Sequence, residues 1–166
     1  YRINVMGQGN DIVEIFFNSM DLKYKKPFGA VKTDTKVYFH IIISSKVKII
    51  DCYLNYEYGL KEFYSGRARM NAERDNKDFF KTKLVMPDEP CLFFYWFEIV
   101  TESDIVYYTR NTDSNDGSGI KSHARPVISV SHTNHIFPFQ ITVYAKDFKT
   151  PDWFKGAVMY QIFPDR

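Results

Sequence analysis

The chain has 166 residues, of which 45% are hydrophobic and 25% are charged. This length predicts one domain with a substantial core, and the composition excludes an intrinsically disordered chain. The net charge of +2 is too small to indicate a protein that binds nucleic acid or anionic membranes, and no apolar run is long enough to span a bilayer.

Aromatic residues make up 17% of the chain, which favours β-structure because aromatic side chains suit pleated surfaces. The first expected strand covers 11–17, and an irregular segment with a Pro-Phe-Gly turn follows it. Segment 36–44 alternates between two faces, with Val37, Phe39, Ile41 and Ile43 on one of them. In segment 46–56 the alternation changes phase near Ile49 and Ile50, which predicts a β-bulge there.

The second half of the chain continues the pattern of short strands separated by turn residues. Segment 91–100 is apolar on both faces, which is typical of a central strand, and 104–109 is expected to pair with it as a hairpin. The other expected elements are a short edge strand near 67–71, a strand at 79–86, a polar loop at 110–126 and a last strand at 137–145. Together they predict an all-β fold, an immunoglobulin-like sandwich of about seven or eight antiparallel strands.

Residues 150–166 have a different pattern from the rest of the chain. Thr150 is a candidate helix cap, Pro151 suits the first helical position, and a single turn through 153–154 would end at Gly156. The run "AVMYQIF" that follows is almost wholly apolar and stops at Pro164. It predicts a strand buried on both faces, outside the sandwich.

Cys52 and Cys91 both fall within expected strands, so two buried thiols are the first interpretation, and one disulfide across the sandwich is the alternative. Reduced cysteines and the lack of a visible signal peptide favour a cytoplasmic location. Secretion is the alternative, because the sequence starts at Tyr1 and a signal peptide would have been removed.

No catalytic or metal-binding constellation stands out. The loop 113–119, "DSNDGSG", resembles a calcium loop in its spacing of Asp and Asn, but it lacks the glutamate and flanking helices of an EF-hand, so we interpret it as a turn. The four histidines (His40, His123, His132 and His135) share no ligand spacing. We therefore expect no catalytic residue and no metal ligand in this chain.

Aromatic side chains are the remaining candidates for a binding site. Segment 53–64, "YLNYEYGLKEFY", places five of them around a turn at Gly59, namely Tyr53, Tyr56, Tyr58, Phe63 and Tyr64. Such rings can stack on sugar rings, while polar neighbours bind the hydroxyl groups. Alternatively, the rings cover an edge of the sandwich or a partner domain. Tyr24, in "LKYKKPF", is a second and weaker candidate.

The sequence also resembles a known family. Segment 150–166, "TPDWFKGAVMYQIFPDR", resembles the junction in the α-amylase family, glycoside hydrolase family 13, where an N-terminal sandwich meets the first strand of a (β/α)8 barrel. Segment 137–153 resembles the last sandwich strand and linker of neopullulanase-like and cyclomaltodextrinase-like members. The segments "FFNSMDLKYKKPFGAV" and "IVYYTRNTDSNDGSG" resemble their N-terminal domain, carbohydrate-binding module family 34.

The resemblance implies a sandwich domain at 1–147 and, at 148–166, a linker with the start of a truncated barrel. A complete barrel takes about 250 residues, and the family's catalytic carboxylates lie beyond its first strand, so this chain is expected to be inactive. The implied role is an accessory domain that binds or positions α-1,4-glucan, or else a structural or dimerisation module. The implied partners are an α-glucan, the catalytic barrel and a second copy of the chain. No cofactor is implied, although calcium would suit the parent enzyme. We expect the orphan strand 158–163 to be the least stable part.

Overall fold

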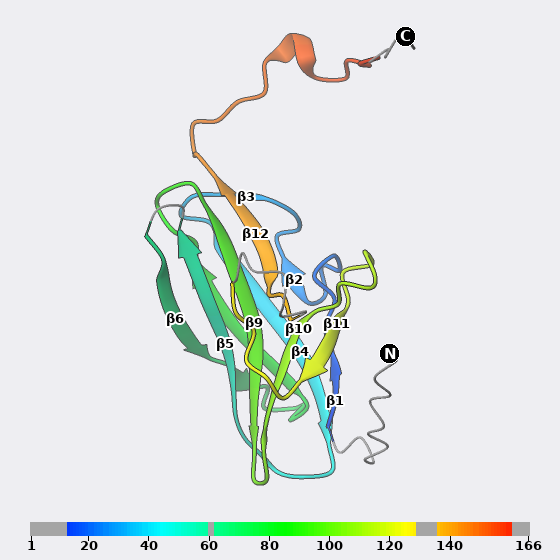
Figure 1. Cartoon of the computed structure of the whole chain (residues 1–166). Coiled ribbons are helices and arrows are strands. Elements are labelled where there is room, and N and C mark those ends of the chain that lie inside the picture. The colour runs from blue at the N-terminus through cyan, green and yellow to red at the C-terminus, as the bar shows by residue number, and fades with distance from the viewer. Residues whose placement is uncertain (1–12, 60–61, 129–135, 161–166) are drawn as a thin grey trace, which may run out of the picture.

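The computed structural model describes residues 13–59, 62–128 and 136–160. Within them the fold is all-β: two mainly antiparallel sheets lie face to face as a sandwich, and the chain ends in a tail that leads away from it (Figure 1). The expected all-β sandwich is therefore confirmed, although the described residues form twelve strands in place of seven or eight. No helix of the described residues is long and apolar enough to cross a bilayer.

The first sheet has five strands, in the order β1-β4-β8-β7, and β2 also pairs with β4. Its strands are β1 (Val13–Phe16), β2 (Lys25–Lys26), β4 (Lys36–Ser45), β7 (Asn71–Ala72) and β8 (Phe79–Val85). β4 has the predicted alternation, since Val37, Phe39, Ile41 and Ile43 are all fully buried. These four side chains form this sheet's part of the core.

The second sheet has seven strands and is built around β9. Its strands are β3 (Val31–Lys32), β5 (Ile49–Gly59), β6 (Tyr64–Arg69), β9 (Cys91–Thr101), β10 (Ile105–Arg110), β11 (Gly119–Ser122) and β12 (Phe139–Tyr144). β5 pairs along one edge of β9, while β10 and β12 share the other edge. β3 pairs in parallel with β12. β9 is thus the central strand that its apolar faces predicted.

Aromatic rings fill the space between the sheets. Phe39 from the first sheet meets the Tyr95 ring of the second edge-on, with centroids 5.0 Å apart, and Tyr95 stacks on Phe139 at 5.2 Å. Phe17 packs edge-on against Phe97 at 4.6 Å. Because each such ring buries a large apolar area, this aromatic layer dominates the stability of the sandwich.

The structure confirms the predicted bulge, because the register of β5 against β9 shifts between Ile49 and Asp51. It corrects the prediction at two strands. β6 starts at Tyr64, before the expected edge strand near 67–71, and β11 lies inside the segment interpreted as a polar loop. Both strands lie at or near the edge of the sheet, are short and contain glycine, so their sequences lack the apolar alternation that identifies a strand.

Both cysteines are buried free thiols, as first interpreted. The Cys52 sulfur lies 3.8 Å from the sulfur of Met70, deep in the core. Burial raises the pKa of both thiols. The two groups therefore act as small apolar side chains and not as nucleophiles.

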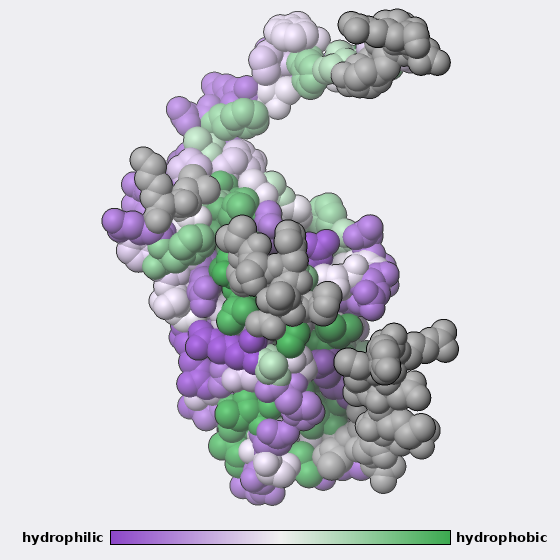
Figure 2. Space-filling model, in the orientation of Figure 1, coloured by the Kyte–Doolittle hydropathy of each residue, from purple (hydrophilic) through white to green (hydrophobic). Residues whose placement is uncertain are grey.

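The tail contains the expected single turn, a 3₁₀ helix at Asp152–Phe154. Pro151 occupies the cap position, which the prediction had given to Thr150, and no side chain caps this turn. Val158, Met159 and Tyr160 are at least 72% exposed and belong to no strand. The rest of the expected strand, 161–163, lies outside the described residues. Figure 2 shows the tail standing off the sandwich, with apolar patches along it.

Candidate functional site: a tyrosine-lined cleft

The hairpin β5–β6 brings two of the predicted tyrosines together at one end of the sandwich. Tyr58 and Tyr64 are cross-strand partners, and their rings stack with centroids 5.5 Å apart and planes inclined by 27°. Tyr58 also stacks on Phe93 of β9, at 5.9 Å and 16°. The tyrosines thus form the outer part of a ring stack that continues into the core.

The alternation of β5 explains why these rings point inward. Cys52 and Leu54 occupy the same face of the strand as Tyr56 and Tyr58, and both are fully buried. Tyr56 lies over Gly66 of β6, where a Cβ atom would sit 2.3 Å from the ring. Glycine at this position therefore allows the ring to lie flat against the neighbouring strand.

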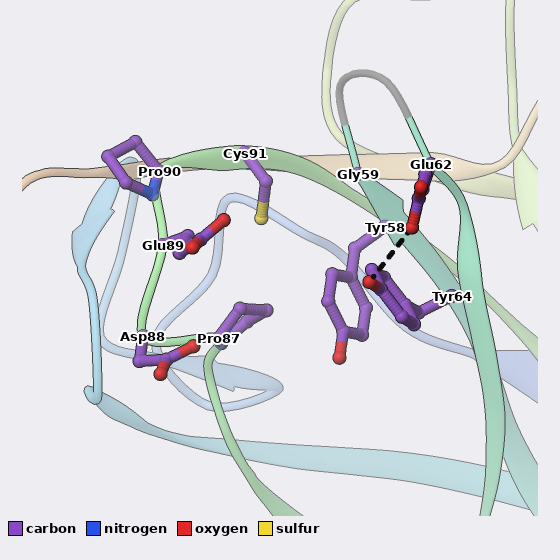
Figure 3. A pocket seen from close by; sticks show the side chains of 9 residues that line it. All are labelled: Tyr58, Gly59, Glu62, Tyr64, Pro87, Asp88, Glu89, Pro90 and Cys91. Carbon is purple, nitrogen blue, oxygen red and sulfur yellow. Dashed lines mark hydrogen bonds between the residues drawn. The ribbon is translucent and has the colours of Figure 1, made fainter.

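The tyrosines line one wall of a cleft of about 580 Å³. The opposite wall is the loop between β8 and β9 (Figure 3). The lining residues are Tyr58, Gly59, Glu62, Tyr64, Pro87, Asp88, Glu89, Pro90 and Cys91. The tail also starts at this end of the sandwich, because Val143 near the end of β12 pairs with Cys91.

The cleft combines flat rings with carboxylates. The Tyr64 hydroxyl donates a hydrogen bond to Glu62 at 3.3 Å, and Asp88 and Glu89 are exposed on the opposite wall. Burial and the neighbouring Tyr56 raise the pKa of Tyr58. Its hydroxyl, like that of any protonated tyrosine, can donate a hydrogen bond at neutral pH. No Lys or Arg is among the lining residues. This chemistry suits a neutral, hydroxyl-rich ligand better than an anion.

Tyr53 lies on the other face of the same sheet. It pairs with Glu98, and the Arg67 guanidinium covers its ring at 3.5 Å from the centroid. Glu98 accepts hydrogen bonds from Arg67 and Asn55, which fixes this arrangement. Because Tyr53 lies on the face of the sheet opposite to Tyr58, it does not contribute to the cleft.

The structure also separates the other candidates from the cleft. Phe63 is 59% exposed but does not line it. Tyr24 packs edge-on against Phe17, with centroids 6.0 Å apart, and is partly buried beside the core. Tyr56 lines a smaller adjoining pocket of about 90 Å³.

Sequence reasoning missed the wall formed by residues 87–91. Most of these residues lie between the expected strands 79–86 and 91–100, and a short polar loop between two strands carries no distinctive signal. The available signal was the pair Asp88 and Glu89 between Pro87 and Pro90, which holds two carboxylates in a restrained loop. Their position opposite the tyrosines depends on how β8 and β9 pack.

The loop 113–119 forms Asx-type turns within itself. Asn111 accepts a hydrogen bond from the backbone N–H of Asp113 at 3.0 Å, and Asp116 accepts one from the N–H of Ser118 at 2.9 Å. Across residues 13–59, 62–128 and 136–160, no three His, Cys, Asp or Glu side chains are grouped so as to hold a metal ion. His132 and His135 lie outside these ranges.

The chain matches amylopullulanases of several bacteria over its whole length. It is 33% identical to an amylopullulanase of Thermoanaerobacterium thermosulfurigenes, over 8% of that protein's length. It is 30% identical to the amylopullulanases of Thermoanaerobacter thermohydrosulfuricus and Thermoanaerobacterium saccharolyticum, over 11% and 12% of their lengths. The chain thus spans about a tenth of the length of these curated relatives. No protein-family model matches it.

Proposed function

We propose that this chain is an accessory β-sandwich module of a glycoside hydrolase acting on α-1,4-glucans, and that the tyrosine-lined cleft binds the glucan. The stacked, accessible pair Tyr58 and Tyr64 opposite a carboxylate-bearing loop carries the proposal. The matches to three amylopullulanases support the polysaccharide setting. The finer assignment, to carbohydrate-binding module family 34 of neopullulanase-like enzymes, rests on the sequence resemblance.

In this proposal the two walls of the cleft have different tasks. The apolar face of a glucose ring stacks on Tyr64, whose side chain is 55% exposed. The carboxylates of Glu62, Asp88 and Glu89 accept hydrogen bonds from sugar hydroxyls. A volume of about 580 Å³ accommodates a short segment of glucan, so the module would hold a chain near the catalytic part of its parent.

Calorimetric titration of the 166-residue chain with maltoheptaose and β-cyclodextrin tests the glucan site. We expect binding at millimolar sugar or below, and a loss of about fivefold in Tyr64→Ala, because one stacking platform contributes on the order of 1 kcal/mol. Tyr53→Ala is the matched control, since that ring lies on the other face under Arg67. Absence of heat with both sugars would rule out this function.

The chain itself is proposed to be inactive, with the catalytic carboxylates in the barrel of the parent enzyme. The purified chain should release no reducing sugar from pullulan or starch. Any release that survives removal of trace amylases would place catalysis in this module instead.

The exposed tail supports a second candidate, a structural module that packs against the catalytic domain or a second copy. Phe148, Trp153, Phe154, Val158, Met159 and Tyr160 are each at least 41% exposed. So many exposed apolar side chains in one short segment are costly in water and are typical of a covered surface. Sedimentation tests this: concentration-dependent association of the chain, abolished by ending it at Ala145, supports the interface and does not depend on sugar.

A further inference from the structure

The outer face of the five-stranded sheet carries a tyrosine with a lysine on either side. Tyr38 of β4 pairs with Lys26 of β2 on one side and with Lys83 of β8 on the other. Its neighbours Val37 and Phe39 are fully buried, so Tyr38 and both lysines project from the opposite, outer face. Tyr38 is 44% exposed.

The cations continue along β4. The next outward positions are Lys36, paired with Val85, and His40, paired with Lys81. None of these outward positions around Tyr38 holds a carboxylate. Lys81 is bonded to Glu73 at 2.7 Å. Lys26, Lys36 and Lys83, in contrast, make no ion pair with any residue in the described part of the chain.

The same face continues as an apolar row. Phe16, Ile42 and Phe79 are in register across β1, β4 and β8. Phe79 also packs against the His40 ring, with centroids 5.1 Å apart. The face therefore combines a flat aromatic surface with lysines that have no ion-pair partner among the described residues.

Lysines on both sides of one exposed ring give this part of the face a local excess of positive charge, which attracts a ligand that carries negative groups. Neighbouring strands lie about 4.8 Å apart, which places the backbones of Lys26 and Lys83 about 10 Å from each other across Tyr38. A ligand that satisfies both lysines must carry more than one negative group and must present a flat surface to the ring between them.

We propose that this face is a second binding site, for an acidic polysaccharide. One sugar ring stacks on Tyr38, and its carboxylate-bearing neighbours pair with Lys26, Lys36 and Lys83. A polysaccharide fits better than nucleic acid, because the chain has a net charge of only +2, whereas a nucleic-acid site is typical of a strongly basic domain. The site is separate from the cleft, whose lining carries carboxylates and no Lys or Arg and so disfavours the same ligand.

The probe is polygalacturonate, titrated at low salt against the 166-residue chain. We expect binding that weakens as salt is raised, and a loss of about tenfold in Lys26→Gln/Lys83→Gln, since each exposed ion pair contributes a few-fold. Tyr38→Ala should also weaken binding several-fold, because it removes the ring on which the sugar stacks. A site that binds by charge alone would keep its affinity in this variant.

Lys46→Gln/Lys77→Gln is the matched control, because it removes the same charge from turns at the far end of the sheet. It should change the affinity less than twofold, and both double variants should bind maltoheptaose as the unaltered chain does. If the two double variants lose the same affinity, or if Tyr38→Ala binds polygalacturonate as the unaltered chain does, then binding reflects general attraction between charges. Either result would refute a specific site at Tyr38. Binding of DNA or of phosphatidylserine vesicles with no binding of polygalacturonate would also overturn it.

Discussion

Replacing Gly66 by alanine tests how tightly the tyrosine stack is packed. The added Cβ would lie 2.3 Å from Cζ and from the hydroxyl oxygen of Tyr56, far inside van der Waals contact. The ring must therefore move, but Phe93 lies against it with centroids 5.3 Å apart. The adjoining pocket of about 90 Å³ gives it some room. We expect a loss of about 1–2 kcal/mol, in the lower part of the range for overpacking.

Thermal and urea unfolding of Gly66→Ala measure this loss. For a chain of 166 residues it corresponds to a Tm lowered by about 2–8 °C. Ser65→Ala, on the same strand and exposed to solvent, is the matched control and should stay within about 0.5 kcal/mol.

A double-mutant cycle identifies the cause. In a Tyr56→Ala background the clash is absent, and Gly66→Ala should be neutral or stabilising by about 0.5–1 kcal/mol, because alanine costs less backbone entropy than glycine in a strand. If Gly66→Ala unfolds at the same urea concentration as the unaltered chain, or is equally harmful without the Tyr56 ring, then the contact between ring and strand does not explain this glycine.

Three further outcomes are expected. Phe39→Ala removes a fully buried ring and should cost about 3–5 kcal/mol in urea unfolding; a loss below about 1 kcal/mol would contradict the central place of this ring in the core. Because burial raises the pKa of Cys52, this thiol should not react with iodoacetamide in the native chain at pH 8 and should react in urea; rapid native labelling would show that it is accessible. Arg67→Ala should cost about 1 kcal/mol, since the Arg67 side chain is half exposed and Glu98 keeps its hydrogen bond from Asn55; a loss above about 3 kcal/mol would indicate a buried role for the ion pair.

The long strands could be predicted because the order of apolar and polar residues in each one follows the burial of its two faces. In β4 the alternation of Val37, Phe39, Ile41 and Ile43 identified both the strand and its buried face. In β5 the change of phase located the bulge at Ile49 to within two residues. The short strands could not be predicted in this way. β2, β3 and β7 have two residues each, and β11 is exposed or half-buried throughout, so neither periodicity nor composition distinguishes them from loops.

The candidate site was predicted only in part for a similar reason. The sequence placed a group of aromatic residues around Gly59, but it could not say which faces they occupy. Alternation along β5 places Tyr53 on one face of the sheet and Tyr58 on the other. The bulge between Ile49 and Asp51 determines which of these faces is turned toward the core. The second wall, at Asp88 and Glu89, comes from a different connection, between β8 and β9.

The sequence by itself determined the all-β class, the main strands and their buried faces, because burial selects residue types one position at a time. Only the tertiary structure decided that Tyr64 and Asp88 face each other across a cleft, and that Lys26, Tyr38 and Lys83 form one row. Those arrangements depend on the register between strands that are distant in the chain. Packing of the whole core fixes that register. The residues that it brings together therefore carry no local sequence pattern from which their proximity could be predicted.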